Sequence, residues 1–184
     1  MHILARTISF EIVKDRKKIF SAPTVRQELE QLIDRSPSPS SAQTHLLRLI
    51  ESSGTKAIDK IPAGDRPALI FLLGSSAFLS DVLIRQGKNW PELFLRQFKI
   101  KKKTVAEHAK ELQAAVTGSP SFDDFCAALR RHKQREYLRI GARDLMPSVT
   151  MEETVRELTA LAEASLDAAY RFCRAEVEKD YGAL

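Results

Sequence analysis

Apolar residues recur at intervals of three and four along most of this 184-residue chain, which is the spacing of amphipathic α-helices. From residue 24 onward, Ser/Pro-rich or Gly-containing breaks separate the helical stretches. The pattern predicts helices at about 24–35, 41–53, 65–73, 76–86, 90–98, 104–116, 121–140 and 151–179. Because no convincing strand follows residue 24, the predicted fold class is all-α, a multi-helix domain of mostly antiparallel helices.

Residues 1–22 fit two patterns, because some of their apolar residues have helical spacing while others alternate as in a strand. This N-terminal segment therefore stays open between a helix and a short irregular or strand segment. The rest of the chain divides into a helical subdomain over 23–120 and a long helical hairpin over 121–184.

The hairpin is expected to bury one apolar stripe on each of its two helices. In the first helix the stripe consists of Phe122, Phe125, Cys126, Leu129, Tyr137 and Ile140. In the second it consists of Met151, Val155, Leu158, Ala162, Leu166, Ala169 and Cys173. Thr150 and Glu153 have the spacing of a capping box at the start of the second helix. That helix would be roughly 45 Å long at 1.5 Å per residue, so it needs neighbours within the chain or beyond it.

Composition narrows the class of protein. The chain has 29 Lys and Arg against 24 Asp and Glu, a net charge of +5, and 43% hydrophobic residues, which is typical of a globular protein. Two cysteines, Cys126 and Cys173, form neither a disulfide framework nor a metal-binding knuckle, which favours a reducing cytoplasm. The strongest apolar run, residues 68–73, is far shorter than the roughly 20 residues of a membrane span, so neither a membrane nor an export segment is predicted.

Arginines give the first candidate for chemistry. Arg131, Arg135 and Arg139 are spaced by four residues, so they share one face of the first hairpin helix, opposite its apolar stripe. A guanidinium binds phosphate or carboxylate oxygens through two parallel hydrogen bonds, which would suit an anion contact. The alternative is a solvated helix face with local pairing of Arg143 and Asp144, and composition alone favours it.

A second basic stretch, residues 85–110, contains eight Lys or Arg and two acids, with Trp90, Phe94 and Phe98 interleaved. This mixture can indicate a nucleic-acid surface. The aromatic residues have helical spacing, however, and core packing explains them better. The last helix also carries eight acids and four bases over 151–180, so nucleic-acid binding is not expected.

The remaining candidates are weaker. Gly74–Ser75 and Gly118–Ser119 resemble the phosphate-binding turn of nucleotidyltransferases. The acids that follow, Asp81 alone and the adjacent pair 123–124, do not form the alternating pair of a two-metal site, so helix caps and turns are the better interpretation. The four histidines, His2, His45, His108 and His132, lack a common ligand spacing. No metal site and no catalytic residue are predicted in this chain.

Three stretches carry a family resemblance. LRRHKQREYLRIGARDL (129–145), followed by EETVRELTALAEASLDAAY (152–170), resembles the glutamine synthetase adenylyltransferase/deadenylylase family, and GSSAFLSDVLIRQGKNWPELF (74–94) is similar to an upstream segment of it. The resemblance covers about residues 70–182, and RIGARDL (139–145) is its most specific part.

The resemblance implies a part of a large bifunctional enzyme. Such enzymes transfer AMP from ATP to a tyrosine of glutamine synthetase and remove it again, with Mg²⁺. Each of their two nucleotidyltransferase domains follows a helical segment. This chain resembles the N-terminal segment, and the segment before the second domain is the alternative. Family members have a Ser-Ser-Asp-Ile-Asp-like strand beyond the helices, and this sequence stops at Leu184 before it. No catalytic residue carries over, and the chain alone is expected to be inactive, without a cofactor of its own.

The implied partners are glutamine synthetase, a small nitrogen-signalling regulator and the enzyme's own nucleotidyltransferase domain. In this light the arginine face becomes a candidate interdomain or partner interface. Its residues are Arg131, Arg135, Arg139, Arg143 and Asp144. The alternative is a stand-alone helical module that binds an acidic or phosphate-rich partner through the same face, or a scaffold.

Overall fold

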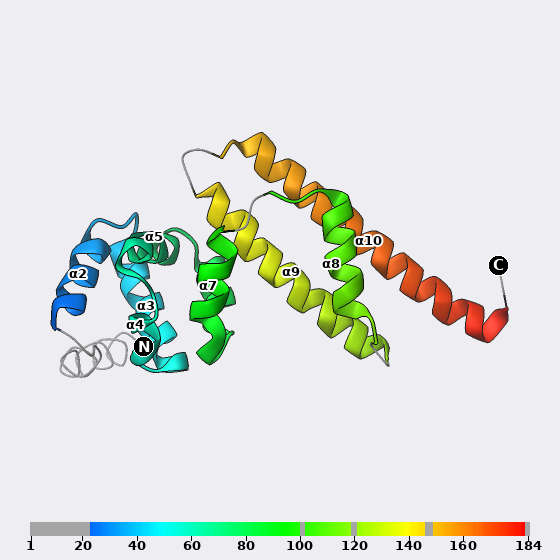
Figure 1. Cartoon of the computed structure of the whole chain (residues 1–184), viewed down its shortest axis with the longest axis horizontal. Coiled ribbons are helices and arrows are strands. Elements are labelled where there is room, and N and C mark those ends of the chain that lie inside the picture. Colours follow the sequence, from blue (N-terminus) through cyan, green and yellow to red (C-terminus); the bar gives the residue numbers. More distant parts are fainter. Residues whose placement is uncertain (1–22, 100–101, 119–120, 146–148, 183–184) are drawn as a thin grey trace, which may run out of the picture. The chain divides into compact units, whose positions relative to one another are not determined.

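The computed structural model describes residues 23–99, 102–118, 121–145 and 149–182 (Figure 1). The open question about residues 1–22 lies outside these ranges. Across the described ranges every regular element is helical, which confirms the all-α class. The helices are α2 (Pro23–Asp34), α3 (Pro39–Ser53), α4 (Lys56–Asp59), α5 (Arg66–Ser75), α6 (Ala77–Ile84), α7 (Trp90–Lys99), α8 (Val105–Val116), α9 (Phe122–Asp144) and α10 (Met151–Tyr181), with 3₁₀ turns η2 (Ala63–Asp65) and η3 (Gly87–Asn89).

The chain forms two compact units that divide between Arg96 and Gln97. The second unit therefore contains α8 together with α9 and α10, which it contacts directly. The sequence pattern instead groups α8 with the helices before it. The reason is that the Gly/Pro-containing loop after Val116 is a stronger break in the sequence than the lysine-rich segment before Thr104.

In the first unit α3 packs against α5 and α6, while α2 packs against α5. The core residues are mostly Leu and Ile, and they include Leu29, Leu46, Leu49, Ile58, Ile61, Leu69, Leu72 and Leu73. Trp90 and Phe94 are also buried, which confirms the core interpretation of these aromatic residues. Among the described helices none alone is both long and apolar enough to cross a membrane. Only Ala63–Ser75 and α6 reach that length and composition together, across a bend of 117°.

Gly74 has a packing role in this unit. It lies in the last turn of α5, and a Cβ added there would stand 3.1 Å from the Cβ of Ser36 and 3.4 Å from that of Ala42. Such contacts are tighter than usual, so any other residue at this position would push Ser36 and the start of α3 away from α5 by a few tenths of an ångström. Ser76 then caps α6 by accepting a hydrogen bond from the amide of Leu79. The Gly-Ser pair thus serves helix packing and a turn, as the cap-and-turn interpretation predicts.

A histidine also ties the first unit together. His45 of α3 is buried, and its Nδ1 lies 2.8 Å from the carbonyl oxygen of Leu73 in α5. Because a carbonyl oxygen only accepts, Nδ1 carries the proton in this contact. The bond satisfies one of the last carbonyls of α5, which have no partner within the helix.

The second unit begins each of its helices with a side-chain cap. Thr104 and Glu107 form a reciprocal capping box at α8. The predicted cap of α10 is half formed: Thr150 accepts from the amide of Glu153, while the Glu153 carboxylate lies 3.6 Å from Lys102 Nζ. These caps place the helix starts where the sequence predicts them.

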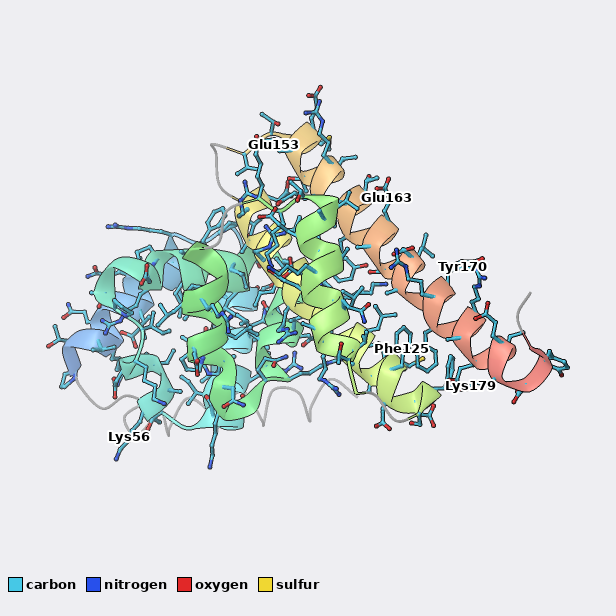
Figure 2. The ribbon with its side chains drawn as sticks, turned by 45° about the vertical axis from the view of Figure 1, so that its right-hand side comes forward. Lys56, Phe125, Glu153, Glu163, Tyr170 and Lys179 are labelled. Atoms are coloured by element: carbon cyan, nitrogen blue, oxygen red, sulfur yellow. The ribbon has the colours of Figure 1, made fainter. Side chains whose placement is uncertain are left out.

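The buried faces of α9 and α10 differ from the predicted stripes. In α10 the buried residues are Glu157, Ala160, Leu161, Ala164 and Ser165. The predicted α10 stripe is instead exposed, with Met151 81% and Leu166 71% exposed. Figure 2 labels the neighbouring Tyr170, which is also exposed on α10. In α9 Phe125 is buried against Phe172 of α10, with ring centroids 4.2 Å apart, but Phe122 is 57% exposed. Helical spacing alone identifies a stripe but does not say which of two stripes meets the neighbouring helices.

Candidate functional site

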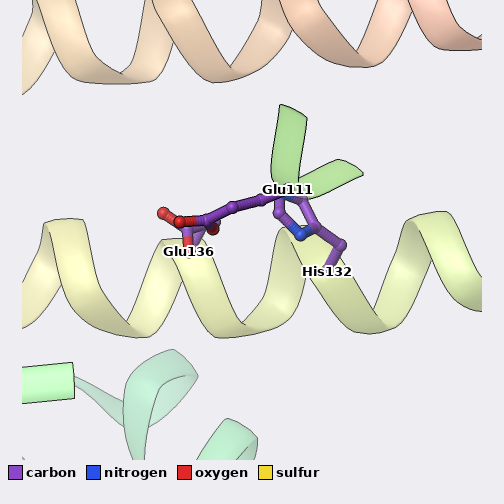
Figure 3. A group of neighbouring side chains, drawn as sticks. All are labelled: Glu111, His132 and Glu136. Carbon is purple, nitrogen blue, oxygen red and sulfur yellow. The ribbon is translucent and has the colours of Figure 1, made fainter. Parts of the chain in front are cut away.

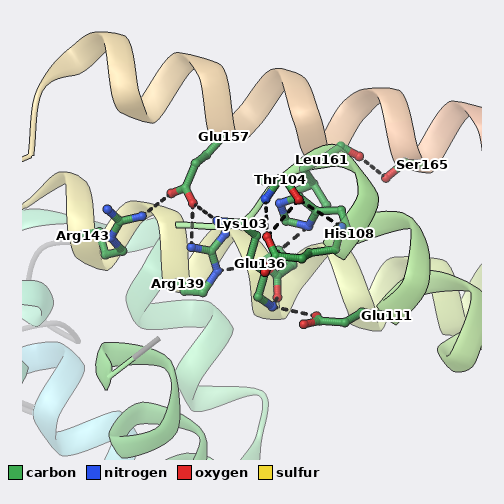
Figure 4. Close-up of polar contacts among 11 residues, drawn as sticks. Lys103, Thr104, His108, Glu111, Glu136, Arg139, Arg143, Glu157, Leu161 and Ser165 are labelled. Carbon is green, nitrogen blue, oxygen red and sulfur yellow. Dashed lines mark hydrogen bonds and ion pairs between the residues drawn. The ribbon is translucent and has the colours of Figure 1, made fainter. Parts of the chain in front are cut away.

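The interior of the second unit holds a group of charged side chains, with the exposed Glu111 at its edge (Figure 4), and we call this group the ion network. Its members come from the loop before α8 and from all three helices, and their charges balance. They are Lys103, Glu111, Glu136, Arg139, Arg143 and Glu157. Charged side chains are rarely buried unless they are paired in this way.

Glu157 holds one half of the ion network. Its Oε1 accepts from the amide of Lys103 at 2.7 Å and from Arg139 Nη1 at 3.0 Å. Its Oε2 accepts from Arg143 Nη1 at 2.6 Å. The side chain is 6% exposed, and that of Arg139 is fully buried. A single carboxylate therefore joins the start of α8 to two successive turns of α9.

Glu136 holds the other half. Its Oε1 accepts from Lys103 Nζ at 2.8 Å, and its Oε2 accepts from Arg139 Nε at 2.8 Å. Burial alone would raise the pKa of Glu136, but the hydrogen bonds from Lys103 and Arg139 hold this pKa below its usual value. The Lys103 ammonium also lies 2.6 Å from Glu111 Oε2 and so pairs with two carboxylates at once.

Two histidines adjoin the ion network. His108 of α8 and His132 of α9 are buried, and their rings meet edge to face with centroids 6.4 Å apart. Among the described residues, neither ring nitrogen of His108 has a hydrogen-bond partner, and the Nε2 of His132 has none either. Burial lowers the pKa of both imidazoles, although the nearby Glu136 opposes this. Both rings are therefore neutral at pH 7.

One group of side chains has the composition of a metal site (Figure 3). Glu111, His132 and Glu136 each offer a ligand atom, and these atoms lie within 4.8 Å of one another. Lys103 Nζ already lies between the two carboxylates. Mg²⁺ favours an octahedral shell of oxygen atoms that includes several waters. A donor set with an imidazole and a bound ammonium does not fit the Mg²⁺ that the family resemblance implies.

The two buried histidines, His108 and His132, should make the stability of the fold depend on pH. The pKa values of both histidines in the folded chain lie below the usual 6.5, so below about pH 6.5 the unfolded chain binds more protons than the folded chain. We expect the free energy of unfolding to decrease from about pH 7 downward, by at most about 1.4 kcal/mol per pH unit for each histidine. Below about pH 4.5, the usual pKa of a glutamate, protonation of Glu136 in the unfolded chain lowers the free energy of unfolding further.

Denaturant unfolding at a series of pH values measures this decrease. The double variant His108→Gln/His132→Gln should show a shallower decrease between about pH 7 and about pH 5 than the unsubstituted chain, whatever its absolute stability. Equal slopes for the two proteins would contradict the assignment of two neutral buried histidines.

The structure does not bring the five predicted interface residues to one exposed surface. Arg131, Arg135 and Asp144 are exposed, and Arg143 is half-buried. The expectation that Arg139 lies on the solvated face is wrong, because this side chain turns inward to Glu136 and Glu157. The interface role of the group stays a prediction, and Arg131, Arg135 and Asp144 are its accessible members.

The sequence patterns did not reveal the ion network, because only apolar residues were expected on the buried face of α9 and the charged residues were expected on its accessible face. The buried positions of α9 also repeat at three and four, but they change from aromatic to charged along the helix: Phe125, Ala128, His132, Glu136 and Arg139. One signal was available. Glu136 is the single acid among six Lys or Arg between residues 129 and 143. A lone acid in a basic stretch is a candidate for a buried partner of those bases.

Comparison with known proteins identifies the family to which the chain is similar. Residues 67–183 match the family model of glutamate-ammonia ligase adenylyltransferase. The bifunctional glutamine synthetase adenylyltransferase/adenylyl-removing enzyme of Nitrosococcus oceani is 31% identical over 131 residues, which cover 67% of this chain and 13% of that protein. The proteins of the same name from Pseudomonas aeruginosa and Mycobacterium tuberculosis are 29% and 28% identical, over 72% and 73% of this chain and 15% and 14% of their own lengths.

No solved structure gives a significant match. The chain spans about one seventh of the length of these curated relatives. The family model covers more than half of the chain, from the first turn of α5 to the end of α10. The chain therefore belongs to the glutamate-ammonia ligase adenylyltransferase family.

Proposed function

We propose that this chain is the N-terminal helical portion of a bifunctional cytoplasmic enzyme that adenylylates and deadenylylates a tyrosine of glutamine synthetase in nitrogen regulation. The observation that supports this most is the family match over residues 67–183, which includes all of the second unit up to its last residues. The relatives that cover most of this chain carry both activities in their names.

We assign the nucleotidyl transfer itself to a separate domain of the whole enzyme, where ATP and Mg²⁺ would bind. The charged groups of the ion network are paired with one another, so they suit a structural task. The ion network holds α8, α9 and α10 in one arrangement, and its six charges neutralise each other. The helical unit would then support or position the catalytic domain, and alone it should not turn over ATP.

The proposed contact surface centres on Arg131 and Arg135. Both are exposed on α9, one turn apart, and neither is needed for the ion network. They can therefore meet carboxylates of the nucleotidyltransferase domain, of glutamine synthetase or of a small regulator protein without loss of the fold. Arg139 and Arg143, by contrast, act through the internal structure.

A chimera tests the proposal. Residues 67–183 of this chain replace the matching region of the Pseudomonas aeruginosa relative, and adenylylation and deadenylylation of glutamine synthetase are measured. We expect both activities within about tenfold of the parent, which corresponds to about 1.4 kcal/mol of transition-state stabilisation. Deletion of the region is the negative control. A folded chimera with no more activity than the deletion would overturn the proposal.

The contact surface is tested in the same chimera. Arg131→Glu/Arg135→Glu should lower at least one activity, while Arg171→Glu on the charged side of α10 serves as a matched control. If neither activity changes, these arginines are a solvated face. The stand-alone binding module then stays as the second candidate, and binding of the chain to a polyanion that weakens steeply with salt would favour it.

A further inference from the structure

A second apolar face runs along α10, on the side that does not contact α8 or α9. Its residues are spaced by three or four over seven turns, and we call them the α10 stripe: Met151, Val155, Leu158, Ala162, Leu166, Tyr170, Cys173 and Val177. The large members are exposed by 38% (Leu158) to 81% (Met151). The buried face of the same helix consists of other residues, from Glu157 to Ser165.

The α10 stripe is larger than a monomer normally exposes. Large apolar side chains this exposed offer on the order of 100 Å² each, so six of them supply roughly 600 Å². Contiguous apolar patches above a few hundred Å² mark interaction sites. A standard interface buries about 800 Å² on each partner, so this surface with its polar rim suffices for a dimer.

The spacing of the α10 stripe is self-complementary. When two copies of α10 run antiparallel around a two-fold axis at position 164, each stripe residue meets another stripe residue. The facing pairs are Met151 with Val177, Val155 with Cys173, Leu158 with Tyr170, and Ala162 with Leu166. In each of these pairs the two positions lie equally far from 164.

We propose that α10 forms a two-fold symmetric, antiparallel interface with α10 of a second copy of this chain. Such an interface uses the same patch on both subunits and closes without further contacts. It also pairs small with large side chains at its centre, where Ala162 faces Leu166, so the helices can approach closely.

The charges beside the stripe agree with this direction. Glu152 is highly exposed at the start of α10, and Arg174 lies near its end on the same side of the stripe. Antiparallel pairing brings Glu152 of one copy within a turn of Arg174 of the other. It also sets the positive end of one helix dipole beside the negative end of the other.

Sedimentation velocity of the full 184-residue chain tests the association. We expect a monomer–dimer equilibrium whose dissociation constant rises at least tenfold in Leu166→Lys. Leu166 is 71% exposed, so this variant should keep the helical circular dichroism of the unsubstituted chain. Ala175→Lys is the matched control and should dimerise normally, because this exposed position is two residues from both Cys173 and Val177 and therefore lies on the opposite side of α10.

Cysteine crosslinking tests the direction. In a Cys126→Ser background, Val155→Cys should give a covalent dimer through Cys173 under mild oxidation. Arg156→Cys, which is exposed at the same level of α10 but points away from the stripe, should not exceed the background. Rapid crosslinking of Cys173 to itself without the new cysteine would indicate parallel helices and overturn the proposal. A chain that stays monomeric at all concentrations would also overturn it, and the stripe would then belong to another part of a longer protein.

Discussion

Glu157→Ala should lower the free energy of unfolding by about 3–5 kcal/mol, which is the usual cost of removing one partner from a buried ion pair. The substitution takes a carboxylate from the fully buried Arg139 and from Arg143, and it leaves the amide of Lys103 without its acceptor. Denaturant unfolding followed by circular dichroism measures the loss. We expect it to exceed the loss from any exposed acid of α10.

Glu163→Ala is the matched control, because it makes the same change six residues further along α10 at an exposed position. This variant should stay within about 0.5 kcal/mol of the unsubstituted chain. The double variant Glu157→Leu/Arg139→Leu should lose less than the sum of its single substitutions, because the two side chains compensate each other. Similar losses for Glu157→Ala and Glu163→Ala would show that the ion network contributes nothing to stability.

Trp90→Ala should lower the free energy of unfolding of the first unit by about 3–5 kcal/mol, through lost burial and the cavity that remains. The side chain is fully buried, and its Nε1 donates to Ser53 Oγ at 2.9 Å. Trp90 is the single tryptophan of the chain, so circular dichroism must replace fluorescence as the readout. A loss below about 1 kcal/mol would contradict a core position for this residue.

Two smaller changes separate packing from hydrogen bonding at the same place. Trp90→Phe keeps most of the apolar volume and removes the donor, and Ser53→Ala removes the acceptor. Loss of such a bond costs about 0.5–1.5 kcal/mol, or more when a buried partner is left unpaired. We expect both variants to have a clearly higher free energy of unfolding than Trp90→Ala.

The sequence predicted the helices well where local chemistry decides. Thr104, Ser121 and Thr150 cap their helices as expected, and Gly54 ends α3 with a positive φ of 86°. Caps depend on neighbours within four residues, so a single sequence contains the information. The helix α3 begins at Pro39, two residues before the predicted start at residue 41. Proline fits the first turn of a helix, so Pro39 belongs to α3 and not to the Ser/Pro-rich segment before it.

The faces of the long helices could not be predicted in the same way. Each of α9 and α10 has two stripes with helical spacing, and the choice between them depends on residues in other elements. Glu136 is buried together with two cations that pair with it, Arg139 in the same helix and Lys103, which is 33 positions earlier in the chain. A rule that places charged residues outside works for Arg131 and Arg135 and fails for Arg139.

The order of charges along α9 has a consequence for the longitudinal alignment of the helices. Glu136 and Arg139 are nearly one turn apart on the same side of α9. If α9 slid by one turn against the loop before α8, Arg139 would take the place of Glu136 beside Lys103. Two cations would then meet in a poorly hydrated interior, which costs far more than a shifted methyl group. The alanines between these helices, such as Ala128, Ala160 and Ala164, tolerate sliding, so the charges select the single alignment.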